Sequence, residues 1–188
     1  MRKAFEDQSG HLRSTLADLS DWHAQIAEVV EKLRATFANG KKVLAAGNGG
    51  SATLAQHFSD EMVGRYRNPR PPLPVVALTA DSAVLTCIGN DFGFEHIFSR
   101  QVEAIGEQGD LLIVFSTSGE SPNITRAREQ AQNQQIMVIA FTGQNGTLAQ
   151  EADLAVISPV QNSPRIQELN LHAVHLICET FEPDSALS

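Results

Sequence analysis

Five short apolar runs, separated by amphipathic stretches, constrain the fold of this chain more than any other feature. Runs of this length and Val/Ile content are typical of strands that are buried on both faces, as in a parallel sheet covered by helices. Their alternation with helical patterns predicts an α/β fold: a doubly wound, flavodoxin-like, five-stranded parallel sheet flanked by helices on both faces. The runs are KVLAA (42–46), PVVAL (74–78), DLLIVF (110–115), IMVIAF (136–141) and DLAVI (153–157).

Helical patterns precede and follow the five runs. Between residues 20 and 37, apolar residues recur at three- and four-residue steps, the spacing of one helix face. Ser20 or Asp21 could cap the start of this helix, and Gly40 closes it. A shorter helix is expected in the stretch up to about residue 19, and a last helix begins at Pro164, a residue suited to a first helical turn.

No long linker or change in composition interrupts the chain of 188 residues, so one domain is expected. The tail EPDSALS is expected to be frayed. The expected parts of the domain are N-terminal helices in 1–40, an α/β core in 41–160 and a C-terminal helix in 164–181.

Composition narrows the range of partners. The formal net charge is −8 and no run of Lys or Arg forms a basic stripe, which disfavours nucleic acid as a ligand. No stretch of about 18 consecutive apolar residues occurs, so no membrane span is expected. The N-terminus carries acids and lacks the apolar core of a signal peptide, which predicts a cytoplasmic protein. Cys87 and Cys178 lie in apolar sequence surroundings and are expected to be buried free thiols.

Two loops rich in glycine and hydroxyl residues follow the first and third predicted strands. They are GNGGS (47–51) and STSGES (116–121), and each leads into a predicted helix. Both would lie at the carboxyl edge of the sheet, where backbone N–H groups, hydroxyls and helix N-termini favour an anion. The alternative is that Ser51 and Ser121 merely cap helices while the glycines turn the chain. The further hydroxyls of residues 116–118 favour a ligand.

The first loop also matches a dinucleotide fingerprint, because Gly47, Gly49 and Ala52 satisfy the G-x-G-x-x-A spacing. That fingerprint requires an acid about 20 residues further on, at the end of the second strand. Asp81 lies more than 30 residues after the glycines, and neither loop has the G-K-[ST] ending of a P-loop. We therefore expect no nucleotide cofactor, and instead a single phosphoryl group on a small molecule such as a sugar phosphate.

Several acids and histidines lie on the predicted helices. His57 and Glu61 are four residues apart and share a helix face. In the last helix the spacing puts Glu168, His172 and His175 on one stripe and leaves Gln167 to one side. Such pairs are usually solvated surface pairs, so spacing alone assigns them no role. In the same way, Asn90 and Asp91 could contact a ligand or could cap a helix that starts near Glu95, and the sequence leaves both open.

In combination, seven motifs resemble the phosphoheptose isomerases of the sugar-isomerase (SIS) domain family, from about residue 20 to residue 181. The resemblance implies the SIS-type α/β fold and an aldose–ketose isomerisation of D-sedoheptulose 7-phosphate to D-glycero-D-manno-heptose 7-phosphate through an enediol. That reaction is the first step of bacterial ADP- and GDP-heptose biosynthesis. The motifs are GNGGS, AQHF..E, GRYR, GNDFGF, FSR, STSG.S and RIQE.

The resemblance also implies roles for particular residues. Glu61 and His175 match the catalytic pair of the family. The implied phosphate ligands are Ser116, Thr117, Ser118 and Ser121, and the implied sugar contacts are Asn48, Gly49, Gly50, Ser51, Glu61, Asn90, Asp91 and Gln167. Some members bind one zinc ion per subunit, and the matching ligands here are His57, Glu61, Gln167 and His175. A homotetramer with active sites between subunits is also implied.

Two points distinguish this chain within the family. Several relatives carry an aspartate where this chain has Pro164, so an orienting role for that acid is absent here or is supplied by another residue. The family also includes an interaction protein that binds a bacterial replication initiator, which is the alternative function. That protein lacks the glutamate and the last-helix histidine, whereas this chain has both Glu61 and His175. His172 is expected to have a structural or surface role.

Overall fold

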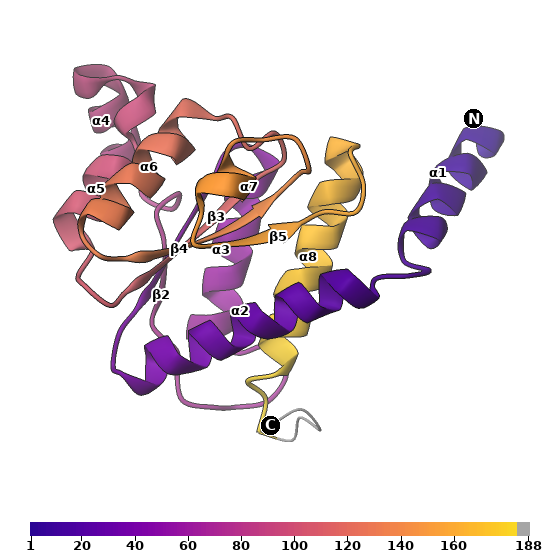
Figure 1. Ribbon diagram of the computed structural model, residues 1–188, viewed down its shortest axis with the longest axis horizontal. Coiled ribbons are helices and arrows are strands. Elements are labelled where there is room, and N and C mark those ends of the chain that lie inside the picture. The colour runs from indigo at the N-terminus through magenta and orange to yellow at the C-terminus, as the bar shows by residue number, and fades with distance from the viewer. Residues whose placement is uncertain (184–188) are drawn as a thin grey trace.

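A five-stranded parallel sheet forms the centre of the molecule (Figure 1), a computed structural model that describes residues 1–183. The strand order is β2-β1-β3-β4-β5, the flavodoxin-like order. The strands are all parallel, and the chain adds β2 on one side of β1 and the later strands on the other, so the switch point lies between β1 and β3. Each of the five apolar runs forms a strand within one residue of its predicted bounds, so the predicted fold class is confirmed. The strands are β1 (Val43–Gly47), β2 (Val75–Ala77), β3 (Leu111–Ser116), β4 (Met137–Thr142) and β5 (Leu154–Ile157).

Helices cover both faces of the sheet, which is why the strands are apolar on both sides. Alternate residues of β1 enter different cores: Val43 and Ala45 pack on one side, Leu44 and Ala46 on the other. The first side is covered by α2 (Ser20–Ala38), α3 (Gly50–Val63) and α8 (Ser163–Glu179). The second carries α4 (Ser82–Phe92), a 3-10 turn (Phe94–His96), α5 (Ser99–Ile105), α6 (Pro122–Asn133) and α7 (Leu148–Glu151).

The N-terminal helices differ in how they pack. Helix α1 (Arg2–Thr15) buries no residue and projects from the body of the molecule (Figure 1). Helix α2 buries the apolar face that its periodicity predicts, from Trp22 to Leu33. Its predicted cap is wrong: the N-cap residue is Leu19, no side chain caps the helix, and the Ser20 hydroxyl bonds the Asp18 carboxylate instead.

Helices α3 and α8 run side by side in the same direction, because each begins at the carboxyl edge of the sheet. Three contacts along their length establish this. A Cβ on Gly50 would lie 2.8 Å from the Gln167 side chain, the His57 and His175 rings are 5.2 Å apart, and the Met62 and Cys178 sulfur atoms are 3.9 Å apart. Residues that are more than 110 positions apart in sequence therefore form one surface.

The chain after α8 departs from the prediction. The prediction that the tail frays from residue 182 is wrong for Glu182. This residue is 2% exposed, and its carboxylate accepts a 2.7 Å hydrogen bond from the Asn68 amide. The rest of the predicted tail, residues 184–188, lies outside the described residues. No helix within residues 1–183 combines the length and apolar character needed to cross a membrane.

The two cysteines have different environments. Cys178 is buried as predicted, and that burial, reinforced by the nearby Glu61 carboxylate, raises the pKa of its thiol to about 12. The predicted burial of Cys87 is wrong: this residue is exposed. It lies on α4, whose one buried residue is Ile88. The apolar sequence around Cys87 therefore forms a helix that is exposed on most sides.

Helix α6 ends with a glutamine in the position that glycine usually occupies. Gln135 has a φ of 60°, and its amide and that of Ile136 bond back to Gln132 and Ala131, which is a Schellman motif. A left-handed conformation costs a non-glycine residue roughly 1–2 kcal/mol, part of which glycine would lose again as unfolded-state entropy. We expect Gln135→Gly to raise the free energy of unfolding by about 0.5–1 kcal/mol in urea denaturation.

The matched control is Asn133→Gly, two residues earlier, where the backbone is still helical. There glycine should lower the free energy of unfolding by up to about 1 kcal/mol. Equal destabilisation of both variants would show that the strain at Gln135 is not relieved by glycine.

Candidate active site

The loops of residues 47–51 and 116–121, here called the serine loops, meet at the carboxyl edge of the sheet. They lie beside the point between β1 and β3 where the strand order reverses. They enclose a pocket of about 70 Å³. With about 30 Å³ of liquid volume for each water, it has room for roughly two waters, which suits a single phosphoryl group. Its lining residues are Asn48, Ser51, Phe115, Ser116, Thr117, Ser118, Ser121 and Gln167. The structure therefore brings the four predicted phosphate ligands together with Asn48, Ser51 and Gln167.

The serine hydroxyls at this pocket are not helix caps. Gly49 is the N-cap residue of α3, and Ser51 lies buried in the first turn. Ser121 occupies the N-cap position of α6, but its side chain makes no capping hydrogen bond. The capping alternative is thus not supported, and two helix N-termini with polar side chains face the same small space, an arrangement that favours an anion.

A pair of amides joins the two loops. The side chains of Asn48 and Asn123 exchange two hydrogen bonds, each 2.8 Å long. Asn123 is fully buried at the start of α6, and Asn48 precedes α3. This reciprocal pair fixes one loop against the other before any ligand binds.

A third loop, residues 143–147, supports the second serine loop from behind. Gly119 has a φ of 69°, and a Cβ on it would lie 2.8 Å from both Gly146 Cα and Thr142 Oγ1. The Leu148 amide donates to the Gly119 carbonyl, and the Thr147 amide donates to the Glu120 carboxylate at 2.6 Å. Sequence reasoning missed this support, although the motif GQNG directly after the fourth strand is a signal for a close backbone approach.

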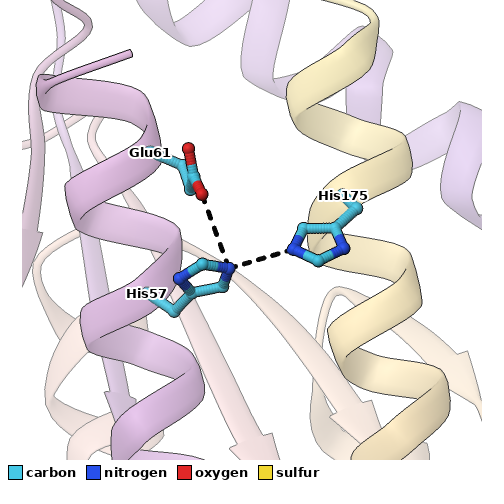
Figure 2. A group of neighbouring side chains, drawn as sticks. All are labelled: His57, Glu61 and His175. Atoms are coloured by element: carbon cyan, nitrogen blue, oxygen red, sulfur yellow. Dashed lines mark hydrogen bonds and ion pairs between the residues drawn. The ribbon is translucent and has the colours of Figure 1, made fainter. Parts of the chain in front are cut away.

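His57, Glu61 and His175 form a second group further along α3 and α8 (Figure 2). The two imidazole Nε2 atoms are 3.0 Å apart, and His57 Nε2 lies 3.6 Å from Glu61 Oε1. All three side chains are half-buried. At that separation one imidazole donates and the other accepts, so the group can hold and move a proton next to a carboxylate.

Gln167 lies nearer the start of α8 than His175. It precedes His175 by eight residues of α8, about 12 Å at 1.5 Å per residue. Its side chain lies against Gly50 and lines the pocket of the serine loops. Of the four metal ligands that the resemblance implies, the structure therefore brings three together and places the fourth with the predicted substrate contacts.

Asn90 and Asp91 lie in the last turn of α4, are exposed, and hydrogen-bond to each other at 2.7 Å. The capping alternative for them is wrong, because the 3-10 turn that follows has Gly93 as its N-cap residue and no side-chain cap. Neither residue lines the pocket of the serine loops. The structure places them at the surface beyond that pocket.

The stripe predicted on α8 splits among three neighbours. Glu168 forms a 2.6 Å ion pair with Arg165, and His175 meets His57 on α3. His172 stacks on Trp22 of α2 with ring centres 5.9 Å apart. Burial, followed by the nearby His23 and His175, lowers the pKa of His172 below its usual value of 6.5.

Trp22 is the single tryptophan of the chain, so its fluorescence reports on His172. We expect a pH titration of that fluorescence to have a midpoint below 6.5, and His172→Gln to abolish the transition. A lowered pKa in the folded state means that the stability contribution of neutral His172 is lost as the pH falls below 6.5 through the folded-state pKa. His172→Gln should therefore lose less stability than the unmodified protein on acidification.

His23 provides the control, because its ring also lies 5.7 Å from Trp22. His23→Gln removes a neighbouring positive charge, so it should keep the transition and move its midpoint upward. A transition that disappears in His23→Gln and persists in His172→Gln would assign the effect to the wrong histidine.

Comparison with known proteins identifies relatives over almost the whole chain. Residues 8–143 match the family model described as SIS domain. The phosphoheptose isomerase of Trichlorobacter lovleyi is 42% identical over 181 residues, which cover 96% of this chain and 91% of that protein. The structure of a phosphoheptose isomerase from Francisella tularensis superposes with a TM-score of 0.86 at 37% identity, over 94% of both chains. The structure of a phosphoheptose isomerase from Neisseria gonorrhoeae superposes with a TM-score of 0.82 at 38% identity, over 94% of both chains.

Proposed function

Because the chain belongs to the SIS domain family, and within it to the phosphoheptose isomerases, we propose that it interconverts D-sedoheptulose 7-phosphate and D-glycero-D-manno-heptose 7-phosphate. Such an enzyme is an aldose–ketose isomerase. In the proposed complex the serine loops bind the phosphate, while Glu61 and His175 act at the other end of the sugar.

The distance between the two parts of the site carries this proposal. From Gly50, beside the phosphate pocket, to His57 is seven residues of α3, about 10 Å along the helix. An extended chain advances about 1.2 Å per bond, so the eight bonds from C1 of a heptose 7-phosphate to phosphorus also span about 10 Å. A seven-carbon sugar phosphate would therefore reach both the pocket and the His57–Glu61–His175 group.

The proposed chemistry is two proton transfers in each direction. Glu61 takes a proton from C1 of the ketose while the C2 oxygen gains one, which gives a 1,2-enediol. Glu61 then returns its proton to C2 while the C1 hydroxyl loses one, which gives the aldose. His175 moves the second proton, from the C1 hydroxyl to the C2 oxygen, so that the carbonyl passes from C2 to C1. A carboxylate and an imidazole suit these roles near neutral pH.

The same group has the donor chemistry for a zinc ion. Two imidazoles and a carboxylate are a common catalytic zinc set, and tetrahedral ligands about 2.1 Å from the metal lie about 3.4 Å from one another. The separations of His57 Nε2 from His175 and from Glu61, 3.0 and 3.6 Å, bracket that value. We propose that His57, Glu61 and His175 hold one zinc ion per subunit. When bound, the ion would supply electrostatic stabilisation of negative charge on the sugar oxygens.

We further propose that the subunits assemble as a homotetramer with active sites at the subunit interfaces. Asn90 and Asp91, implied sugar contacts, lie at the surface of α4 next to exposed Phe92 and Phe94. Exposed apolar side chains beside polar ones are typical of a surface that another subunit covers. An adjacent subunit could then bring Asn90 and Asp91 to a substrate.

The alternative function, an interaction protein that binds a replication initiator, is not favoured. The relatives are phosphoheptose isomerases over more than 90% of this chain. The two residues whose absence would support the alternative, Glu61 and His175, are present and lie in one group.

The test is turnover of D-sedoheptulose 7-phosphate, followed by NMR as the aldose 7-phosphate forms. It should be run on the protein as purified, after chelation, and after addition of zinc. Formation of the aldose supports the isomerase. Saturable binding of the sugar phosphate without turnover under all three conditions would overturn the proposal and leave a binding protein.

A further inference from the structure

The end of α3 that carries Glu61 is held by a buried arginine and a buried glutamate from two other parts of the chain. We propose that Arg70 and Glu182 are positioning residues that hold Glu61 against His175. This inference rests on the proposed function, since it assigns the pair a role in the reaction of that site.

Arg70 binds the backbone at the end of α3. Its Nη2 donates to the Glu61 carbonyl at 2.7 Å, and its Nη1 donates to the Met62 carbonyl at 2.8 Å. The last carbonyls of a helix have no partner within the helix, and a positive charge is favourable at that end. The Arg70 side chain, only 4% exposed, thus fixes the backbone of the residue that we assign as the base.

Glu182 connects this arginine to α8. Its carboxylate accepts the Asn68 amide at 2.7 Å and the Arg67 amide at 3.4 Å, both in the segment that leads from α3 to Arg70. Glu182 lies three residues after the end of α8, the helix that carries His175. The pair therefore joins the end of α3 to the end of α8.

The geometry argues against a role in ion pairing alone. Arg70 Nε lies 4.0 Å from Glu182 Oε1 and has no hydrogen-bond partner, although the glutamate side chain is fully buried. A buried ion pair that is loosely matched contributes little stability, because desolvation offsets the attraction between the charges. The short contacts of both side chains are instead to backbone groups: Arg70 binds the carbonyls of Glu61 and Met62, and Glu182 binds the amides of the segment that leads from α3 to Arg70.

The experiment compares Arg70→Gln, Arg70→Lys and Glu182→Gln with Arg128→Gln. Arg128 is the matched control: 11% exposed, with a buried Nε that lacks a partner and a 2.7 Å ion pair to Glu151, it lies on the opposite face of the sheet. Three quantities are measured for each variant: the melting temperature, and kcat and KM for sedoheptulose 7-phosphate.

We expect Arg70→Gln to lower kcat by about 10- to 100-fold, since a misplacement of about 1 Å can cost roughly 100-fold in rate. KM should stay nearly constant, because the phosphate loops lie at the other end of α3. Glu182→Gln should lower kcat less than Arg70→Gln does. Arg70→Lys keeps the positive charge, so its kcat should lie between those of Arg70→Gln and the unmodified protein. Arg128→Gln should lower the melting temperature comparably and leave kcat unchanged. An equal loss of kcat in Arg128→Gln, or a rise in KM alone, would overturn the inference.

A second readout separates this inference from the proposed function. Imidazole nitrogen shifts of His57 and His175, measured by NMR without substrate, should change in Arg70→Gln and remain unchanged in Arg128→Gln. If the unaltered protein shows no turnover, the proposed function fails, while these shifts still test whether the pair positions the group. Identical shifts in both variants would overturn the positioning role.

Discussion

Glu61→Gln and His175→Gln are each expected to lower kcat by about 10²- to 10⁴-fold, the range that a positioned acid or base typically contributes. Glutamine keeps nearly the size of either side chain but can neither accept a proton from carbon nor pass one between two oxygens. KM should change little, because the proposed phosphate ligands lie about 10 Å away along α3. The measurement is the initial rate of aldose 7-phosphate formation over a range of substrate concentrations.

The chain offers matched controls for both substitutions on α8. Glu168→Gln and His172→Gln make the same chemical changes, but Glu168 pairs with Arg165 and His172 stacks on Trp22. Both controls should keep kcat within about threefold, well below the smallest loss expected of a catalytic group. If Glu61→Gln keeps more than about a tenth of kcat, the carboxylate does not take the proton. A comparable loss in either control would place the chemistry elsewhere on α8.

The predicted fold agrees with the structure because its signal is local. A strand buried on both faces must be apolar throughout, and each of the five apolar runs lies within one residue of the strand that it predicts. The sheet order then follows from the crossovers, and with it the meeting of the two serine loops at the carboxyl edge. The pocket between these loops could therefore be predicted from sequence, and its role as a phosphate site stays a proposal.

The arrangement of side chains around α8 could not be predicted in the same way. Helical spacing shows which residues share a stripe, but the neighbour of each depends on how α8 packs between α2 and α3. Glu168, His172 and His175 share a stripe and contact Arg165, Trp22 and His57 respectively. Gln167, to one side of that stripe, lines the pocket of the serine loops because α3 begins there with Gly50.

Glu182 and Cys87 show the limit of composition as a guide to burial. An acid in a polar tail is usually solvated, but Glu182 is buried where the amides of residues 67 and 68 donate to its carboxylate. Cys87 lies in an apolar stretch, but on a helix that packs through few residues. For Glu182 the deciding contacts come from a distant part of the chain, and for Cys87 such contacts are missing, among the described residues, from its exposed side.

Gly119→Ala is expected to raise KM for the sugar phosphate by about 100-fold. The residue has a φ of 69°, which costs a residue with a Cβ roughly 1–2 kcal/mol. The new Cβ would also lie 2.8 Å from Gly146 Cα and from Thr142 Oγ1, so the loop of residues 116–121 must shift. Loss of two hydrogen bonds to a charged phosphate, at about 1.5 kcal/mol each, corresponds to about 100-fold.

Inhibition by inorganic phosphate should weaken in Gly119→Ala in parallel with KM, because the proposed role of this loop is to bind the phosphate and not the reacting carbons. The free energy of unfolding should fall by about 2–3 kcal/mol, the sum of the backbone strain and the displaced contact. Gly10→Ala is the control: it is the same substitution in a helix, with no atom within 4 Å of the new Cβ, and should leave KM unchanged. If Gly119→Ala loses stability while phosphate inhibition stays the same, the loop does not bind the phosphate. The 10 Å span to His57 would then no longer support a seven-carbon substrate, because that span is counted from this pocket.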